Sequence, residues 1–370
     1  MNPIRAPWKG SMTARERFNR QMHYRSVDRC FNMEFGYWEE NFVEWPMFRE
    51  NGIRSNEEAD RFFSFDPIHS ISGNIFMHPA MKEEIISETD THVTVRSSAG
   101  LIEERLKKGS SIPRYLGSVI RTPADWDRVK KEHFDVQHPD RVLDVASLAA
   151  KHPDSRDYPL GIHCGSMIGR VRDLLTFEGI CYALYDYPDM LEDMVETMCV
   201  LVEHSLHQLL PHITFDFASG WEDICFNHGP ILPPWFFRDV VAPRYRRIHE
   251  KLRQYGVDLW YTDCDGDVRP LIPIFLESGI NCLFPFEVNS CTHPGNLLRE
   301  YAGSLRIMGG VDKIELAKGP EAIDRYLNTL VPLVEAGGYI PFCDHRCPPN
   351  VKQEDYLYYL DKKEELFGMR

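Results

Sequence analysis

Three apolar runs of this chain are each followed by acidic residues. In two of the three, a cysteine or a histidine stands beside the acids. The runs lie in Leu259-Trp-Tyr-Thr-Asp-Cys-Asp-Gly-Asp267, in Gly338-Tyr-Ile-Pro-Phe-Cys-Asp-His345, and at residues 213–218, followed by Gly-Trp-Glu222. Carboxylates beside a buried strand are unfavourable unless they are paired, hydrogen-bonded or bound to a cation. These three strand ends therefore indicate an enzyme site that uses proton transfer or a bound metal.

Three aspartates alternate along residues 263–267. Alternate residues at a strand end can face the same side of a sheet, so Asp263 and Asp265 are candidate metal ligands or acid/base groups. Asp267 precedes an expected helix, where an acid interacts favourably with the helix dipole. We interpret Asp267 as structural and Asp263 as functional, and both roles stay open for Asp265. Cys264 points away from its neighbours and is interpreted as structural.

Three further residues stand directly after expected strands. His345 could bind a metal, act as a general acid or donate a hydrogen bond to a substrate. Glu222 could complete a set of oxygen and nitrogen ligands, or it could be a surface acid. Glu287 ends Phe-Pro-Phe-Glu and has the same position after a strand. Asp263 and His345 are the preferred acid/base or ligand residues.

A second group of residues suits substrate binding. Arg170 and Arg172 follow another strand, where a guanidinium could hold a substrate carboxylate through two parallel hydrogen bonds. The alternative is a structural salt bridge to Asp173 or Glu178. Trp221 and Tyr261 could stack on a flat ligand, although core packing is the alternative for both.

Strands and helices alternate from about residue 158 to the C-terminus. Such alternation predicts parallel strands joined by crossover helices. With no Gly-rich phosphate loop, the regular repeat favours a closed (β/α)8 barrel, whose reacting groups lie at the carboxyl ends of the strands. The expected strands are 159–164, 213–218, 257–262, 280–286, 305–308 and 339–343, and the expected helices are 188–210, 234–255, 268–277, 294–301, 320–335 and 353–366.

The first half of the chain predicts additions to the barrel. Residues 12–23 suggest an amphipathic helix capped by Ser11 or Thr13. Residues 31–37 suggest a first strand, 57–64 a short helix, and 91–106 a hairpin of alternating character. We expect one domain over residues 1–370, with an N-terminal helical elaboration at 1–30 and a hairpin excursion at 88–108.

Composition excludes several classes of function. The 42 basic and 56 acidic residues give a net charge of −14, which argues against sequence-independent nucleic-acid binding. No run approaches the ~18 apolar residues that cross a bilayer, and the first 21 residues are too polar for a signal peptide. Ten cysteines without a Cys-x-x-Cys pair are expected to be reduced. A cytoplasmic enzyme is the resulting expectation.

Several motifs at these strand ends resemble the uroporphyrinogen decarboxylase superfamily in their order and spacing. The resemblance covers most of the chain and is densest from residue 158. It implies a (β/α)8 barrel and an enzyme that either decarboxylates its substrate or transfers methyl groups with corrinoid proteins. The matching segments are Gly161-Ile-His-Cys-Gly-Ser-Met-Ile-Gly-Arg170, Phe177-Glu-Gly179, 216–221, Leu232-Pro-Pro234, Pro243-Arg-Tyr245, Gly309-Gly-Val-Asp312 and Gly338-Tyr-Ile340, with His345 and Pro349.

The chain departs from the true decarboxylases of this superfamily. Their N-terminal Arg-Gln-Ala-Gly-Arg-Tyr segment binds substrate carboxylates, whereas this chain has Arg20-Gln-Met-His-Tyr24. Phe63-Ser-Phe-Asp66 suggests Asp66 as the counterpart of their catalytic aspartate, and Leu175 stands where they have a tyrosine. Acidic strand ends also disfavour a substrate with four anionic side arms.

The zinc-dependent methyltransferases of the superfamily imply a ligand set. When their His-x-Cys-Gly motif is aligned on Gly266, Asp263 takes the place of the histidine and Asp265 that of the cysteine. Their distant cysteine corresponds to His345, and Glu222 is a candidate fourth ligand. Asp/Asp/His ligands would accept Zn²⁺, Fe²⁺ or Mn²⁺.

The resemblance and the missing decarboxylase features favour a one-carbon (methyl) transferase. Methylcorrinoid or tetrahydrofolate would be the co-substrate, and the expected partners are a small-molecule substrate, a corrinoid protein and a second copy in a homodimer, the last by analogy alone. A cofactor-free decarboxylase of a small carboxylic acid is the alternative, with Asp66 or Asp263 stabilising a developing cation. A non-catalytic small-molecule binder is the third possibility. Nucleic acids and membranes are not expected partners.

Overall fold

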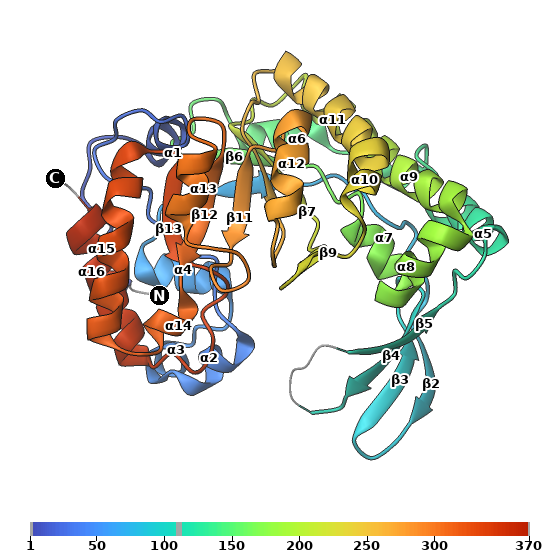
Figure 1. The fold of residues 1–370 in the computed structure, drawn as a ribbon, viewed down its shortest axis with the longest axis horizontal. Coiled ribbons are helices and arrows are strands. Elements are labelled where there is room, and N and C mark those ends of the chain that lie inside the picture. The colour runs from blue at the N-terminus through green and yellow to red at the C-terminus, as the bar shows by residue number, and fades with distance from the viewer. Residues whose placement is uncertain (1–2, 109–112, 369–370) are drawn as a thin grey trace.

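A parallel seven-stranded sheet forms the centre of the molecule in a computed structural model that describes residues 3–108 and 113–368 (Figure 1). Every neighbouring pair in this sheet is parallel. In spatial order the strands are β1 (His69–Ile71), β6 (Leu160–His163), β7 (Phe217–Trp221), β10 (Trp260–Asp263), β11 (Cys282–Phe286), β12 (Arg306–Val311) and β13 (Tyr339–Cys343). Their carboxyl ends therefore lie along one rim.

Helices follow the strands of the second half, as the alternating pattern predicts, and the α/β barrel architecture is confirmed. They are α7 (Gly169–Leu175), α8 (Phe177–Asp186), α9 (Pro188–Leu209), α10 (Pro234–Phe236), α11 (Ala242–Gln254), α12 (Ile272–Ser278), α13 (Pro294–Glu300), α14 (Lys313–Leu316), α15 (Pro320–Ala336) and α16 (Gln353–Phe367).

The strand predicted at 213–218 begins four residues later, at Phe217. Asp216, just before it, accepts hydrogen bonds from Arg15 at 2.8 Å, Arg156 at 2.8 Å and the backbone N–H of Leu160 at 2.9 Å. These bonds hold Asp216 at the amino end of the sheet, where its charge is neutralised by two guanidinium groups.

The segment predicted as the first strand, 31–37, does not join the sheet, so the seven described strands do not close into an eight-stranded ladder. Beside β13, side-chain contacts of this segment take the place of backbone hydrogen bonds between strands. The Glu34 carboxylate accepts the Cys343 N–H at 3.1 Å and binds the buried Lys363 ammonium at 2.7 Å. One isolated bridge pairs Tyr37 with Cys347. A buried ion pair thus anchors this segment, and an ion pair with every oxygen satisfied is tolerated inside a protein.

Helix α1 (Ala14–Met22) packs under the sheet at the end opposite the rim. Thr13 caps it, as predicted, by accepting the Glu16 N–H. Phe18 and Met22 are fully buried in a cluster with Phe217 and other inward-facing side chains of the sheet. The helix therefore forms the floor of the barrel.

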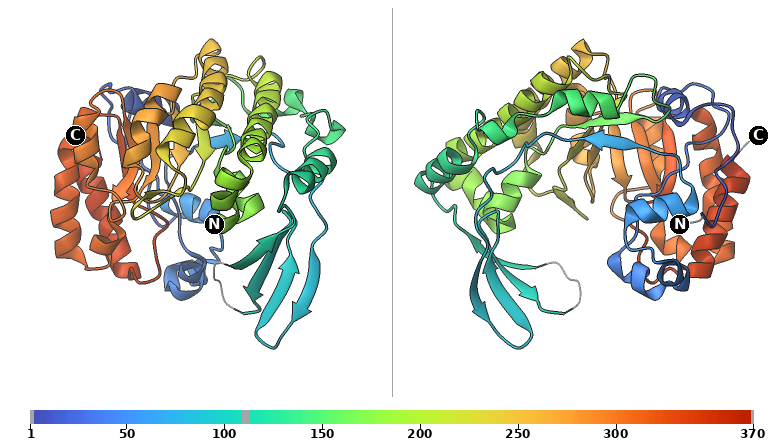
Figure 2. Two further views of the ribbon diagram at one scale, coloured as in Figure 1. Left: turned by 45° about the vertical axis from the view of Figure 1, so that its right-hand side comes forward. Right: turned by 180° about the vertical axis from the view of Figure 1, so that it is seen from behind.

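The chain between β1 and β6 forms an antiparallel four-stranded sheet that projects from the barrel (Figures 1 and 2). It consists of β2 (Glu84–Glu88), β3 (His92–Arg96), β4 (Leu101–Leu106) and β5 (Arg114–Ser118), and we call it the arm. The predicted hairpin is its β3–β4 pair. The remaining elements before β6 are α2 (Glu39–Glu44), α3 (Pro46–Asn51), α4 (Asn56–Phe63), α5 (Pro123–His133), the 3-10 helix η1 (Pro139–Arg141) and α6 (Val145–Lys151).

All ten cysteines carry free thiols, in agreement with the expectation of reduced cysteines. In the described part of the chain, each helix is too short or too polar to span a bilayer.

Candidate active site

Strand β10 points its odd-numbered side chains toward the barrel interior. Tyr261 stacks on Phe217 at a centroid distance of 5.6 Å and on Phe284 at 4.7 Å, both members of the interior cluster. Trp260, its neighbour, packs outward against α11 through Tyr245. Asp263 has the same parity as Tyr261 and lies at the carboxyl end of β10, so its carboxyl group faces the mouth of the barrel.

Asp263 has a strongly perturbed carboxyl group. Burial, together with the nearby carboxylates of Asp265 and Asp223, raises its pKa to about 8, while Arg346 opposes the shift. A carboxyl group with this pKa is mostly protonated at neutral pH. Asp263 can therefore donate a proton, which an ordinary aspartate cannot do under these conditions.

Asp265 and His345 form a pair next to Asp263. Oδ2 of Asp265 lies 3.3 Å from Nε2 of His345. The other oxygen, Oδ1, is buried and has no hydrogen-bond partner among the described residues. The imidazole contacts the rings of Phe35 and Trp38 at centroid distances of 5.6 and 5.9 Å. The structure therefore places Asp265 beside His345, with Asp263 two residues earlier in the chain and aromatic rings against the imidazole.

Glu222 has a different setting from the one predicted. Its carboxylate, which is buried, accepts the backbone N–H groups of residues 167–169 at 2.8–3.0 Å. The hydroxyls of Ser166 and Tyr245 donate to the same carboxylate at 3.1 and 2.5 Å. Five donors occupy its two oxygens, so Glu222 holds the start of α7 in place and has no free oxygen for a metal.

The predicted four-ligand metal set is not assembled. Both carboxylate oxygens of Glu222 are already hydrogen-bonded. Asp263, Asp265 and His345 are not among the described groups of three residues whose potential ligand atoms all lie within 4.8 Å of one another. Only Asp265 and His345 approach each other closely. This arrangement fits a proton-transfer site better than a closed metal site, because a metal requires three or four converging donors.

A cationic and aromatic group lies after the ends of β6 and β7, which precede β10 in the order of the sheet. Arg170 stacks between the rings of Phe76 and Trp221, at 4.9 and 5.0 Å from their centroids, and its side chain is 44% exposed. Arg172 also lies over Trp221, but Asp223 and Asp173 bind its guanidinium at 3.1 and 3.2 Å. The guanidinium of Arg172 is therefore held in structural salt bridges, which was the alternative to substrate binding. Arg170 pairs with Asp173 at 3.2 Å, and its side chain remains accessible.

Two pockets open near this group. The one that Arg170, Arg172 and Trp221 line has a volume of about 360 Å³ and is closed on the other side by Leu101 and Tyr115 of the arm. A larger pocket of about 650 Å³ lies between β5 and α8 and contains none of the predicted site residues. The smaller pocket is the one that could hold a substrate beside Arg170.

Sequence reasoning missed two residues near the mouth, Asp223 and His163. Asp223 links Arg172 to the end of β10, because its carboxylate binds Arg172 while its N–H donates to the carbonyl of Asp263. His163 lies on β6, with Nδ1 3.3 Å from the Ser219 hydroxyl, and burial followed by Arg170 lowers its pKa to about 4. Asp223 adjoins a predicted residue and could have been included. The pattern alone gives no signal for His163, since its neighbours are brought in by the fold.

Glu287 lies at the rim, where its carboxylate forms an ion pair with Lys313. Burial raises its pKa, yet the Lys313 ammonium 2.7 Å away holds that pKa below the ordinary value. The buried Asp344 lies 3.6 Å from the same ammonium and accepts the N–H groups of Val288 and Lys313. This network joins the ends of β11 and β13 and stabilises the rim.

Asp66 precedes β1 and so lies toward the amino ends of the strands, whereas the mouth is at their carboxyl ends. Its carboxylate binds Arg29 through two bonds of 2.6 and 2.7 Å and accepts the N–H of Asn32 at 2.9 Å. The structure therefore does not bring Asp66 together with Asp263 and His345.

This placement gives a first prediction. Asp66→Asn is expected to lower the free energy of unfolding by about 1–3 kcal/mol, because a bidentate ion pair is broken and the buried Arg29 loses that partner. The rate of the folded enzyme should change less than threefold. Urea denaturation and steady-state kinetics on one preparation measure both. A rate loss of two orders of magnitude with unchanged stability would restore Asp66 as a catalytic residue.

Comparison with known families decides the affiliation. The family model described as uroporphyrinogen decarboxylase (URO-D) matches residues 98–363, which is well over half of the chain. The chain belongs to the uroporphyrinogen decarboxylase family. The arm from β4 onward, the mouth residues at 163–345 and most of α16 fall within the match, so this family membership covers the candidate site. Comparison with curated protein sequences finds no match.

One solved structure supports the fold of this chain. A "methyltransferase from Methanosarcina mazei" has a TM-score of 0.58 and 14% identity, over 97% of this chain and 100% of that one. A B12-independent methionine synthase from Shewanella sp. W3-18-1, in complex with selenomethionine, has a TM-score of 0.40 and 13% identity, over 78% of this chain and 76% of that one. At such identities the first similarity supports the fold alone.

Proposed function

We propose that this uroporphyrinogen decarboxylase family member is a methyltransferase in which Asp263 is the proton donor. One observation carries the proposal: a carboxyl group that burial keeps protonated at neutral pH lies at the mouth of the barrel. Transfer of a methyl group from oxygen, nitrogen or sulfur leaves an electron pair on that atom. A positioned acid that delivers a proton there accelerates the transfer.

The proposed step conserves atoms and charge. The bond between the methyl carbon and the heteroatom breaks, the methyl group passes to the acceptor, and the heteroatom takes the proton of Asp263. Asp263 becomes a carboxylate beside Asp265 and Asp223, whose charges disfavour that state. This repulsion favours return of a proton from solvent, so that Asp263 is ready for the next cycle.

Other mouth residues support binding and orientation. Arg170 presents an exposed guanidinium between two aromatic rings, which suits a carboxylate or an electron-rich ring of the substrate. Trp38 is 40% exposed beside His345 and offers a flat surface. The methyl acceptor would be a corrinoid protein or a folate, either of which supplies the nucleophilic atom when bound.

Decarboxylation of a small carboxylic acid is the second candidate, and the same acid favours it. Loss of CO2 leaves an electron pair on carbon, and the protonated Asp263 could supply the proton that this carbon needs. Arg170 would then hold the departing or a second carboxylate. The two candidates differ in the group that is released, so their products separate them.

The test is an assay for methyl transfer to cob(I)alamin, with methyl ethers, methylamines and methyl thioethers as donors. We expect at least one donor to give methylcobalamin, detected by its absorption spectrum, at a rate that falls in Asp263→Asn. A matched panel of small carboxylic acids is assayed for CO2 release. No methylcobalamin from any donor, together with CO2 release that depends on Asp263, would replace methyl transfer by decarboxylation.

A further inference from the structure

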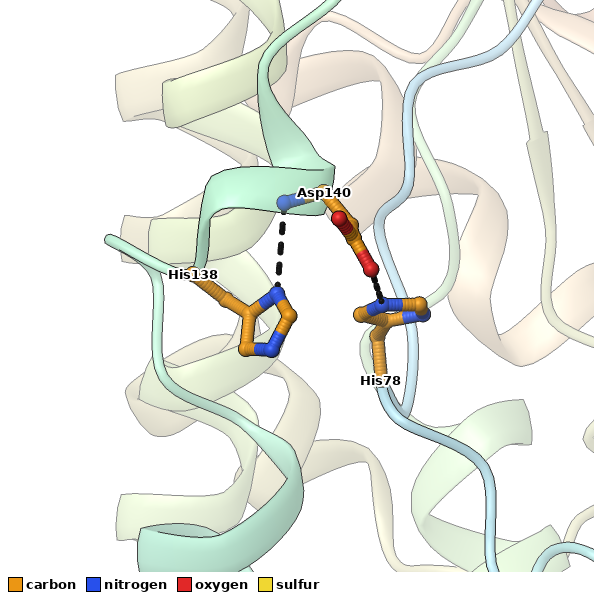
Figure 3. A group of neighbouring side chains, drawn as sticks. All are labelled: His78, His138 and Asp140. Carbon is orange, nitrogen blue, oxygen red and sulfur yellow. Dashed lines mark hydrogen bonds and ion pairs between the residues drawn. The ribbon is translucent and has the colours of Figure 1, made fainter.

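Two histidines and an aspartate converge at the base of the arm, remote in sequence from the mouth residues. One ring nitrogen each of His78 and His138 and a carboxylate oxygen of Asp140 lie within 4.8 Å of one another. Figure 3 shows the two imidazoles on either side of the carboxylate. Nε2 of His78 lies 2.9 Å from Oδ2 of Asp140, and the two imidazole centroids are 4.8 Å apart. Among the described residues this is the one threesome of potential ligands at such distances.

We propose that His78, His138 and Asp140 bind a zinc ion that clips together the two segments joining the arm to the barrel. Two imidazoles and one carboxylate form a common ligand set for Zn²⁺, with the fourth position left to water. Imidazole donors also disfavour Mg²⁺ and Ca²⁺, which prefer oxygen alone.

The ligands come from both connections of the arm. His78 lies in the segment 72–83, through which the chain enters β2, whereas His138 and Asp140 lie at η1, which follows the exit through β5 and α5. A metal ion would therefore join the incoming and outgoing chain. This position suits a structural role, because a link between distant segments restricts their relative movement.

The backbone beneath the site is already held in place. Arg141 is 1% exposed and donates to the carbonyls of Asn74 at 2.5 Å and His133 at 3.1 Å, so it ties the same two segments. The N–H of His78 also donates to the His133 carbonyl at 2.7 Å. The ligands thus approach one another on a fixed framework, which lowers the ordering entropy that metal binding must overcome.

The side chains themselves remain available to a metal. Those of His78 and Asp140 are 27% and 67% exposed, and each makes its closest polar contact with the other. A zinc ion bound between Nε2 of His78 and Oδ2 of Asp140 would replace the proton of their hydrogen bond. Nδ1 of His138 accepts the Asp140 N–H at 3.2 Å, a long hydrogen bond that the metal would replace if it binds at this nitrogen.

Calorimetric titration of the chelator-treated full-length protein with zinc chloride tests the proposal. The wild type is expected to bind about one zinc per chain, and His78→Ala and Asp140→Asn should each weaken binding about tenfold or more. Both residues are on the surface and outside the mouth, so the variants should fold. His212→Ala, which removes an exposed histidine elsewhere, is the matched control and should bind as the wild type does.

Thermal unfolding gives a second readout that does not depend on enzymatic activity. Zinc should raise the melting temperature of the wild type and of His212→Ala, and leave both site variants unchanged, since a ligand stabilises only the state that it binds. Two outcomes would overturn the proposal: no binding heat up to about 1 mM zinc, or the same affinity and stoichiometry in wild type and both site variants. Neither outcome bears on methyl transfer.

Discussion

Asp263→Asn is expected to lower the rate of the enzyme about 100-fold or more and, at the same time, to make the folded protein more stable at neutral pH. Asparagine retains the size of the side chain but has no proton to donate, so the step that needs an acid loses that contribution. It also removes a carboxyl group that burial and two neighbouring carboxylates oppose in its charged form. The gain in the free energy of unfolding is expected to be on the order of 4 kcal/mol at pH 7, because one pKa unit corresponds to about 1.4 kcal/mol.

The pH dependence of both effects follows from the raised pKa. In the wild type the acid form is required, so the rate should fall as the pH rises through about 8. The unfolded chain releases this proton near pH 4, whereas the folded chain keeps it until about 8. Wild-type stability therefore falls across that interval, and the advantage of Asp263→Asn is absent below pH 4 and largest at and above pH 8.

Urea denaturation and rate measurements at pH 5, 7 and 8.5 check this pair of effects. Asp127→Asn, at an exposed position on α5, is the matched control and should change neither quantity. Retention of the wild-type rate in Asp263→Asn would show that proton donation comes from another group. An unchanged unfolding free energy at every pH would show that Asp263 is charged in the folded protein.

Glu222→Ala is expected to destabilise the protein by about 3–5 kcal/mol, enough to unfold many proteins of ordinary stability. The substitution removes the acceptor of three backbone N–H groups at the start of α7 and of two buried hydroxyls. Each of these donors would be left buried without a partner. Burial and the carboxylate of Glu222 also raise the pKa of Tyr245, so its hydroxyl remains a donor at every accessible pH.

A graded series separates this structural role from metal ligation. Glu222→Gln retains one oxygen acceptor and should lose less stability than Glu222→Ala. Glu250→Ala, an exposed position on the same helix as Tyr245, should have almost no effect. Circular dichroism with chemical denaturation gives the order of stability. If Glu222→Ala instead kept its stability and lost a bound metal, the predicted ligand role would be restored.

The sequence predicts the parts of this fold that depend on local pattern. Apolar runs ending in acids locate β10 and β13, and Asp263 and His345 follow from their place after those runs. Residues whose setting depends on distant partners are beyond such reasoning. Glu222 has the position of a ligand, yet its partners come from residues 166–169 and from Tyr245.

The N-terminal segment shows the same limit. Residues 31–37 have the pattern of a strand. In place of backbone pairing with the sheet, the Glu34 side chain bonds to Cys343 and Lys363, more than 300 residues away. Nothing in the local sequence indicates those partners. The arm is an intermediate case, because the alternating pattern predicts its β3–β4 hairpin, whereas β2 and β5 are recognised only from their pairing with it.

The position of the arm has a consequence for the order of folding. Strands β1 and β6 are neighbours in the sheet, although residues 72–159 separate them. Closing so long a loop has an entropic penalty before any contact offsets it, whereas the hairpins of the arm close over a few residues. The arm is therefore expected to become structured early and to shorten the effective distance between β1 and β6. In pulse-labelling hydrogen exchange, the amides of β3 and β4 should become protected before those of β1.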